Sequence, residues 1–320
     1  MDINKYVDYL DTFIKDYNGK TMSNQIDESH GITHMTMVLK HATEALNNWT
    51  GRPIDEKEIF KVRLAALLHD IDDSKYFDNN HYENAKYILD QVDKDSNILS
   101  EKDKNDIIQM IEWVSSSKNG DRIPPEAVGK EYLLYPRYAD RLEALGIIGL
   151  ERTLHYTLNK AQKEGKYDNK NNIFLTEYPE TLFIKKGDVL VDTKRATDLE
   201  DLYNNIATLE RYQSYSKGSK SMMDHFYDKL LRLGKYPIDN VYFNAETQKR
   251  QGPLEDIALE FGRNPDMTER ELKALMESKI SHVGGKRIKR VDKTRVNKKR
   301  TNKKRNNKRR TNKKRNNKNK

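Results

Sequence analysis

Apolar residues recur at helical spacing along most of this chain. Over residues 1–20 they lie three or four positions apart, which places them on one face of a helix: Tyr6, Leu10, Phe13, Ile14 and Tyr17. The same spacing predicts further helices over residues 33–49, 55–70, 81–92, 101–114, 131–155, 197–214, 219–233, 254–262 and 267–280. The pattern therefore predicts a mainly α-helical protein.

The helical spacing is lost between residues 157 and 200. Short apolar runs at 173–175, 182–184 and 189–191 flank polar turns, a pattern typical of a β-hairpin. We therefore interpret residues 157–215 as partly an insertion, with a small β-hairpin-like segment, in an otherwise helical bundle.

Charge is divided unevenly along the 320 residues, whose net charge is +9. Residues 286–320 carry 20 Lys and Arg and one acid, a net charge of +19, whereas residues 1–285 have a net charge of −10. From residue 297 onward the chain repeats Asn, Lys and Arg and has no apolar residue. Such a segment cannot bury surface to offset the entropy lost on ordering. We therefore expect a body, residues 1–281, and a disordered Lys/Arg/Asn-rich tail, residues 282–320.

Composition excludes several classes of protein. The chain has no Cys, which excludes a disulfide scaffold and a thiolate metal site. It has no run of 18 apolar residues, so no transmembrane helix and no membrane partner are expected. The segment Met1–Lys5 lacks the apolar core of a signal peptide. We expect a cytoplasmic protein, with a nuclear location as the alternative because of the basic tail.

Three segments contain residue types that bind divalent metals. The first ends at His34, the second is the apolar run 62–71 that contains His69 and Asp70, and the third contains Asp140. Two imidazoles and two carboxylates make a mixed nitrogen and oxygen donor set for a divalent ion. Such an ion lowers the pKa of a bound water and polarises a phosphoryl oxygen. Together the segments predict a metal-dependent phosphohydrolase site.

The order His, His-Asp, Asp resembles the HD-domain superfamily of metal-dependent phosphohydrolases, and in particular its bacterial stand-alone nucleotide pyrophosphohydrolases. Four stretches carry the resemblance, in the family's order: His34–Val38, Leu67–Ile71, Ala139–Gly149 and His225–Leu233. It covers roughly residues 25–155 and 215–265. It implies an HD-domain helical bundle in which four residues hold the metal: His34, His69, Asp70 and Asp140.

Four residues near these ligands are candidates for further chemistry. In related phosphohydrolases a carboxylate at the place of Asp73 orients or deprotonates the attacking water; the alternative is an acid that stabilises a turn. His30 lies four residues before the first ligand and is expected to line the site, where it would meet the substrate. Lys75 is either a phosphate-binding residue or a surface lysine. Arg141 either clamps a phosphate in a catalytic role or holds neighbouring carboxylates.

The expected reaction is hydrolysis of a nucleotide phosphoanhydride or phosphate ester by metal-activated water. The resemblance suggests nucleoside triphosphates cleaved to a monophosphate and pyrophosphate, with a 5′-nucleotidase reaction as the nearest alternative. The partner is then a nucleotide or other phosphorylated small molecule. Mn²⁺ is the cofactor we favour, and Mg²⁺, Ni²⁺, Co²⁺, Fe²⁺ and Zn²⁺ are the alternatives.

A second hypothesis makes the chain a nucleic-acid-binding protein that uses the HD fold as a scaffold. The basic tail would bind phosphates without sequence preference and with a steep salt dependence. The tail has no aromatic residue, so base stacking is not indicated. The two hypotheses differ in one geometric expectation, which is that the four ligand side chains of an enzyme converge on one point.

Overall fold

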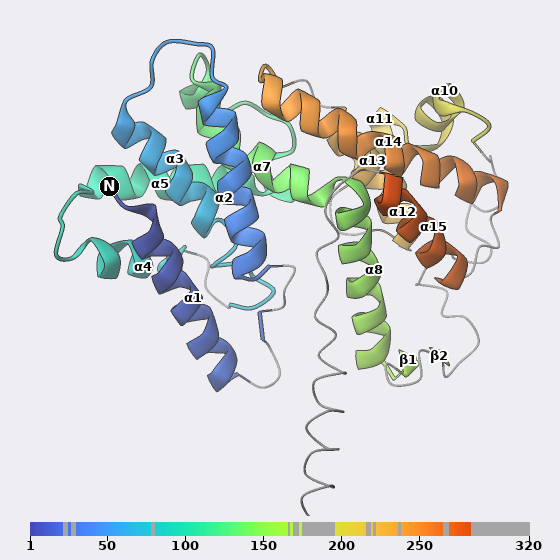
Figure 1. Cartoon of the computed structure of the whole chain (residues 1–320), viewed down its shortest axis with the longest axis horizontal. Coiled ribbons are helices and arrows are strands. Elements are labelled where there is room, and N and C mark those ends of the chain that lie inside the picture. Colours follow the sequence, from blue (N-terminus) through green and yellow to red (C-terminus); the bar gives the residue numbers. More distant parts are fainter. Residues whose placement is uncertain are drawn as a thin grey trace, which may run out of the picture. The chain divides into compact units, whose positions relative to one another are not determined.

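The computed structural model describes residues 1–21, 25–26, 30–77, 81–165, 167–168, 173–174, 196–215, 219, 222–235, 238–264 and 269–282. Within these residues almost every element is a helix, which confirms the predicted mainly α fold (Figure 1). The chain divides into two units, Met1–Lys279 and Ile280–Lys320. The predicted tail, apart from its first residue, lies outside the described residues.

Six helices form the N-terminal bundle: α1 (Ile3–Lys20), α2 (Ile32–Asn47), α3 (Glu56–Leu68), α4 (Glu83–Asp93), α5 (Glu101–Val114) and α7 (Tyr135–Ala144). Helix α2 packs against both α3 and α7, and α3 packs against α5 (Figure 1). Side-chain caps set where these helices begin. Asp55 accepts a hydrogen bond from the Lys57 amide, and Ser100 and Asp103 form a reciprocal capping box.

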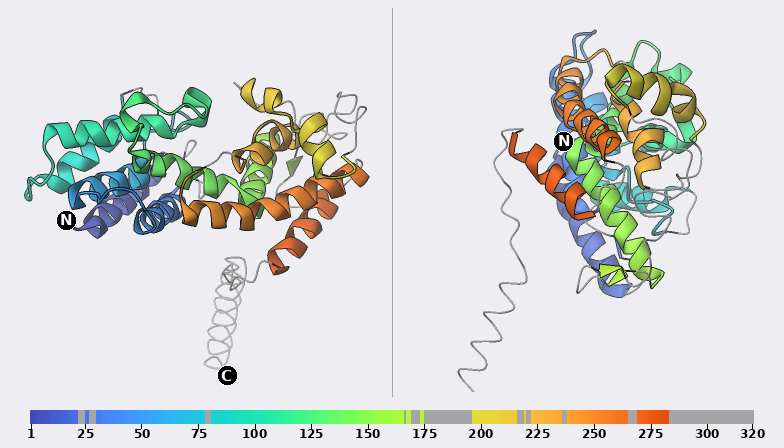
Figure 2. Two further views of the ribbon diagram at one scale, coloured as in Figure 1. Left: turned by 90° about the horizontal axis from the view of Figure 1, so that it is seen from above. Right: turned by 90° about the vertical axis from the view of Figure 1, so that its right-hand side faces the viewer.

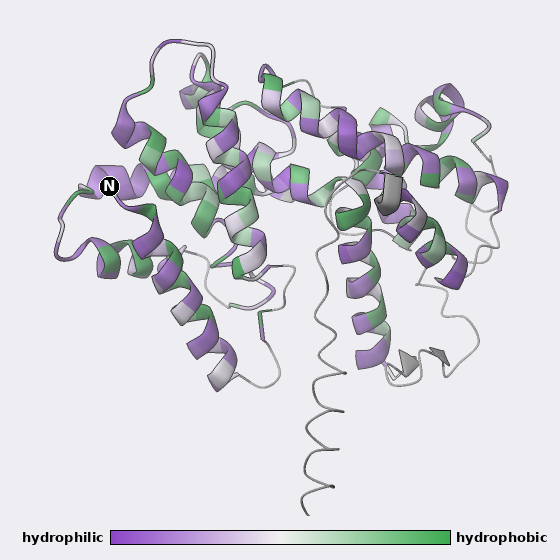
Figure 3. Ribbon diagram, in the orientation of Figure 1, coloured by the Kyte–Doolittle hydropathy of each residue, from purple (hydrophilic) through white to green (hydrophobic). Residues whose placement is uncertain are grey.

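The core-facing side of α2 combines apolar residues with two histidines. Met35, Val38 and Ala42 are fully buried, and His34 and His41 are buried on the same side. Each helix carries hydrophobic and hydrophilic stripes of this kind (Figure 3). Burying a polar group costs free energy unless it finds a partner, so buried histidines in a helical core indicate a network or a ligand site.

The predicted single helix over residues 131–155 is wrong, because the structure divides this stretch into three elements. They are a 3₁₀ turn η2 (Glu131–Leu134), helix α7 and helix α8 (Gly146–Lys163). Leu145 is extended and Gly146 has a φ of +77°, a left-handed conformation that costs other residues free energy. Gly149 is needed as well, since a Cβ there would lie 1.9 Å from the Ala144 carbonyl oxygen.

Helical elements resume from residue 199 onward. They are α10 (Leu199–Asp201), η3 (Leu202–Ile206), α11 (Leu209–Gln213), α12 (Met222–His225), η4 (Phe226–Leu230), α13 (Leu231–Leu233), α14 (Val241–Arg263) and α15 (Glu269–His282). Of these, η3 and η4 are π-helical turns. Helix α14 contacts α2 and α7 of the N-terminal bundle and also α8 and α13, and so connects that bundle to the helices that follow it (Figure 2).

The predicted start of a helix at residue 254 is also wrong, because α14 begins at Val241. Asn240 caps it by accepting a hydrogen bond from the Phe243 amide, and Phe243 is fully buried. Pro253 lies inside the helix. A proline removes one intrahelical hydrogen bond, and the helix continues through it with Gln251 and Leu254 buried on either side.

The remaining elements are short: α6 (Ser116–Asn119), η1 (Pro125–Ala127), β1 (Tyr167–Asp168) and β2 (Ile173–Phe174). The two strands pair antiparallel, with Tyr167 opposite Phe174. This pair is part of the predicted hairpin region, but the other expected strands at 182–184 and 189–191 lie outside the described residues. Among the described helices, none combines the length and apolar character that crossing a bilayer requires.

Candidate metal centre

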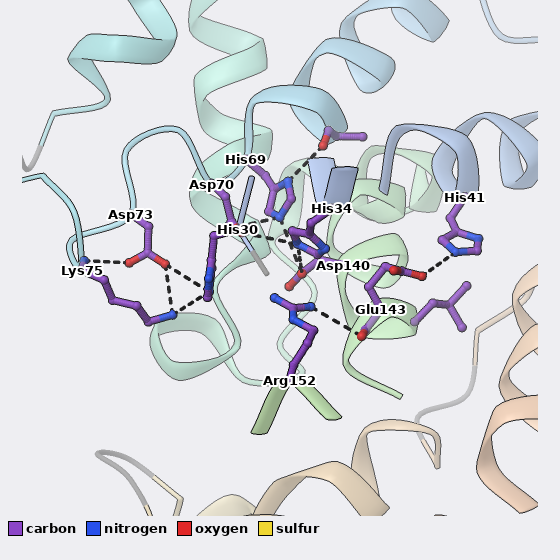
Figure 4. Close-up of polar contacts among 12 residues, drawn as sticks. His30, His34, His41, His69, Asp70, Asp73, Lys75, Asp140, Glu143 and Arg152 are labelled. Carbon is purple, nitrogen blue, oxygen red and sulfur yellow. Dashed lines mark hydrogen bonds and ion pairs between the residues drawn. The ribbon is translucent and has the colours of Figure 1, made fainter. Parts of the chain in front are cut away.

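Three packed helices bring the four predicted ligands to one place (Figure 4). His34 is in the first turn of α2, His69 and Asp70 directly follow α3, and Asp140 is on α7. His69 is the C-cap residue of α3 and keeps right-handed helical backbone angles, and Asp70 is next to it in the turn that follows. The four side chains therefore lie close together, with each histidine Nε2 within 3.6 Å of carboxylate oxygens of both Asp70 and Asp140. Their role as metal ligands stays a prediction.

The nitrogen and oxygen atoms of this cluster face a common centre. His34 Nε2 lies 3.4 Å from Asp70 Oδ2 and 3.4 Å from Asp140 Oδ1. His69 Nε2 lies 3.3 Å from Asp70 Oδ1 and 3.6 Å from Asp140 Oδ1. Candidate donor atoms of His34, His69 and Asp70 all lie within 4.8 Å of one another. Among the described residues, neither Nε2 atom has a hydrogen-bond partner, although both are buried.

The other ring nitrogen of His69 explains how this side chain is held. Its Nδ1 lies 3.0 Å from the carbonyl oxygen of Ala66. Because a carbonyl only accepts hydrogen bonds, Nδ1 carries the proton and donates it. In the neutral ring the lone pair is then on Nε2, which faces the cluster. A backbone carbonyl that fixes the tautomer in this way is a common support of metal-binding histidines.

The charges of the cluster also suit a cation. Burial alone would raise the pKa of the Asp70 and Asp140 carboxyls. The two nearby imidazoles lower it by more than burial raises it, so both pKa values lie well below the usual range. Burial lowers the pKa of His69, whereas the two carboxylates raise it, with a net rise. The carboxylates that favour an imidazolium would equally favour a divalent cation. Two imidazole nitrogens and two ionised carboxylates that face one centre fit such an ion.

His30, Asp73 and Lys75 form a second cluster beside the first. The Lys75 amine lies 2.9 Å from His30 Nε2 and 3.2 Å from Asp73 Oδ2, and the Tyr76 hydroxyl lies 3.2 Å from His30 Nδ1. The rings of His30 and His34 lie 6.4 Å apart, centroid to centroid. In Figure 4 His30 lies between Asp73 and the metal cluster. The structure thus brings the candidate site residues His30, Asp73 and Lys75 together.

Asp73 also stabilises the turn after α3, since its Oδ1 accepts a hydrogen bond from the Lys75 amide at 2.9 Å. The two predicted alternatives, an acid that stabilises a turn and a carboxylate that orients water, are compatible. Oδ1 stabilises the turn, whereas Oδ2 of the same side chain faces the Lys75 amine and His30. Its catalytic role stays a prediction.

Arg141 is buried and contacts the loop that follows α6. Its Nη1 donates to Asp121 Oδ1 at 2.7 Å and its Nη2 donates to the Gly120 carbonyl at 2.7 Å. These contacts favour the predicted alternative in which the guanidinium holds a neighbouring carboxylate. A phosphate-clamping role for Arg141 stays a prediction that its contacts do not favour.

Sequence analysis missed a buried network on the other side of α2. His41 Nε2 lies 2.9 Å from Glu143 Oε1, which also accepts a hydrogen bond from Arg250 Nη1 at 3.0 Å. Arg250 Nη1 also donates to the Leu142 carbonyl at 2.6 Å. His41 follows His34 by seven residues and Glu143 follows Asp140 by three. The network therefore joins α2, α7 and α14 close to two of the ligands. Its signal was the position of His41 and Glu143 on core-facing sides.

Comparison with known proteins places the fold in a family. Residues 31–145 match the HD domain, and this stretch contains all four cluster residues. A protein of Acanthamoeba polyphaga mimivirus, described as uncharacterized, is 34% identical over 253 residues, which are 75% of this chain and 91% of that protein. The chain belongs to the HD-domain family. The viral protein and this HD-domain protein are thus relatives over nearly the whole of the viral sequence.

Several solved bacterial structures are similar at lower identity. The HD-domain protein is 17% identical to the Lin1889 protein of Listeria innocua, with a TM-score of 0.44 over 84% of this chain and 100% of that chain. It is 20% identical to a Bacillus thuringiensis protein described as an HD-superfamily hydrolase, with a TM-score of 0.45 over 83% of this chain and 100% of that chain. The HD domain, together with the donor set, supports a metal-dependent phosphohydrolase.

Proposed function

We propose that this HD-domain protein hydrolyses a phosphoanhydride bond of a nucleotide. The observation that carries the proposal is the convergence of the His34 and His69 Nε2 atoms with the carboxylates of Asp70 and Asp140. A divalent ion bound there would lower the pKa of water and polarise a phosphoryl oxygen. The side chains of the protein would hold this ion, accept a proton from water and bind the phosphate of the substrate.

The Nδ1 proton of His69 is donated to the Ala66 carbonyl, so its Nε2 is the atom that would bind a metal, and a bound cation would take the place of the Nε2 proton that the carboxylates favour without it. Asp70 and Asp140 remain ionised over the physiological range, since their pKa values are lowered. The two carboxylates would neutralise the charge of a divalent ion, and the two imidazoles would complete the donor set.

The His30, Asp73 and Lys75 cluster is the part of the site best suited to move a proton. Asp73 faces both His30 and the Lys75 amine, so a proton passing from water to either His30 or Asp73 stays within one hydrogen-bonded group. Lys75 is half-exposed, and its ammonium group suits a phosphate oxygen entering from solvent.

The nucleotide specificity of the proposal is supported by the four sequence stretches shared with nucleotide pyrophosphohydrolases. In the preferred reaction a nucleoside triphosphate yields a nucleoside monophosphate and pyrophosphate. A 5′-nucleotidase reaction on a monoester is the alternative. The metal that we favour is Mn²⁺.

We also propose that the basic tail binds nucleic acid, because its net charge of +19 favours any polyphosphate through counterion release. This association would be separate from hydrolysis, since the four ligands and the second cluster lie in the first unit.

The test of the proposed reaction is a product analysis. Purified protein is incubated with nucleoside mono-, di- and triphosphates and with Mn²⁺, Mg²⁺, Ni²⁺ or Co²⁺, and the products are resolved by ³¹P NMR. Pyrophosphate from a triphosphate is the expected product. Inorganic phosphate from a monophosphate alone would replace the proposal with the nucleotidase alternative. No metal-dependent product with any nucleotide would overturn it.

A further inference from the structure

Two cationic side chains near the metal cluster have no carboxylate partner among the residues that the structure describes. Arg152 is on α8 and is half-buried. Its Nη1 donates a hydrogen bond to the Glu143 carbonyl oxygen at 3.5 Å. In Figure 4 the Arg152 guanidinium points toward Asp140. Among the described residues, no carboxylate lies within ion-pair distance of it.

Lys229 is on an element that packs close to the helix of Arg152, because η4 directly follows and contacts α12, and α12 contacts α8. It is on the π-helical turn η4 and is also half-buried. Its Nζ lies 5.7 Å from the centre of the Tyr215 ring, and no described residue offers it a hydrogen bond or an ion pair. The neighbouring carboxylate of Asp228 instead contacts Arg211 and Ser219.

The electrostatic surroundings of Lys229 show what it faces. Burial lowers its pKa, the carboxylate of Asp140 raises it, and the positive charges of Lys75, Arg141 and Arg152 lower it. The amine is therefore within electrostatic reach of a ligand of the metal cluster and of three other cations. Near it, burial and the charge of Lys229 lower the pKa of His225 to about 4, so that imidazole is neutral at physiological pH.

Positive charges that gather without carboxylates indicate a missing anion. A half-buried cation loses hydration, and the loss is offset only when an opposite charge or hydrogen-bond acceptor arrives. Arg141 and Lys75 already contact Asp121 and Asp73, respectively. Arg152 and Lys229 have no such contact, so the anion that they await comes from outside the described chain.

We propose that Arg152 and Lys229 bind the phosphate chain of the substrate next to the metal cluster and select a polyphosphate over a monophosphate. This inference rests on the proposed function. The Arg152 fork suits two oxygens of the phosphate nearest the cluster, and the Lys229 ammonium suits a more distant phosphate. Both residues lie outside residues 31–145, so the selectivity comes from elements added to the HD domain.

The experiment compares Arg152→Gln and Lys229→Gln with the wild type. For the Mn²⁺-loaded protein, calorimetry measures the affinity for inorganic tripolyphosphate and for inorganic phosphate. A charged hydrogen bond typically changes an affinity about 10-fold or more, so each variant is expected to bind tripolyphosphate at least about 10-fold more weakly. Binding of inorganic phosphate is expected to change less in Lys229→Gln, and the KM for a triphosphate is expected to rise more than kcat falls.

Lys249→Gln and Arg263→Gln are matched controls, because both residues are on α14 and more than half of each side chain is exposed. Lys229→Met keeps the apolar stem and is the second variant if the glutamine disturbs packing. Equal tripolyphosphate affinity in folded variants and wild type would overturn the inference even if nucleotides are hydrolysed. Weakened tripolyphosphate binding without any nucleotide hydrolysis would support it while removing the proposed function.

Discussion

The imidazole ring of His34 lies with its centroid 5.2 Å from that of His69, and the Nε2 atom of each ring is buried without a hydrogen-bond partner among the described residues. The two histidines come from different helices, and both face the carboxylates of Asp70 and Asp140. Each Nε2 is 3.3–3.6 Å from carboxylate oxygens without a well-formed hydrogen bond, an arrangement that a cation between the nitrogens and the carboxylates would complete. The geometry therefore favours a metal centre over a purely structural histidine pair.

His69→Ala should abolish metal-dependent hydrolysis and leave a helical protein. The substitution removes one donor from the cluster, whereas the helices are stabilised mainly by apolar burial in α2, α3 and α7. Nucleotide hydrolysis and far-ultraviolet circular dichroism measure the two effects. Asp70→Ala should behave in the same way. His155→Ala, at an exposed position on α8, is the control. Full activity in either ligand variant would show that the ligands are wrongly assigned.

Asp73→Asn should lower kcat by about 10²- to 10⁴-fold, the usual range for a lost general base, while the protein still binds metal. The amide keeps an oxygen for the Lys75 backbone amide, so the turn after α3 is expected to survive. Steady-state kinetics and Mn²⁺ binding check the two parts. An unchanged kcat would leave Asp73 with its structural role in the turn alone.

Glu143 should make the protein sensitive to acid. Burial raises its pKa, but hydrogen bonding to His41 and the charge of Arg250 lower it, from 4.5 to about 2. A lowered pKa stabilises the fold above pH 4.5, and this stabilisation is lost as pH falls toward 2. The lowered pKa of Glu143 corresponds to a contribution to the free energy of unfolding on the order of 3 kcal/mol at neutral pH.

Urea unfolding between pH 7 and pH 3 measures this effect. Glu143→Gln should be less stable than the wild type at pH 7 and should lose less stability on acidification. Glu126→Gln, at an exposed position, should follow the wild-type profile. Identical pH profiles for Glu143→Gln and the wild type would show that the buried network does not depend on the charge of Glu143.

Truncation after Ser281 should leave hydrolysis of small substrates unchanged and remove retention on DNA or RNA at low salt. The reason is that the removed residues carry the net charge of +19, whereas the metal cluster belongs to the first unit. Filter binding over a salt series and nucleotide hydrolysis are the two measurements. Loss of hydrolysis in a truncated protein that stays folded would assign the tail to the catalytic machinery.

The sequence predicted which four residues lie together because their order along the chain resembles that of the HD-domain superfamily. His34, His69, Asp70 and Asp140 also combine imidazole and carboxylate groups that suit a divalent ion. The α-helical class followed from the spacing of apolar residues, which is a local property. The start of α14 did not follow, because Asn240 and Phe243 begin that helix through burial against distant residues.

The role of Arg152 could not be predicted either, because it is one cation among 59 in the chain and nothing in its neighbours distinguishes it from a surface residue. Lys229 lies in the stretch His225–Leu233 that carries the resemblance, but the sequence does not show what surrounds its side chain. What distinguishes them is a tertiary property, namely half-burial near Asp140 without a carboxylate partner. The break between α7 and α8 was only partly predictable. The sequence shows a glycine at position 146, but it does not show that this glycine adopts a left-handed conformation.

The central claim, that these four side chains form one metal site, is tested most directly by the stoichiometry of Mn²⁺ binding. Electron paramagnetic resonance counts free Mn²⁺ during titration of metal-free wild-type protein and of Asp70→Ala. The account predicts one tightly bound ion per chain in the wild type and loss of that ion in the variant. Equal binding by both proteins, or no tight binding by the wild type, would contradict it.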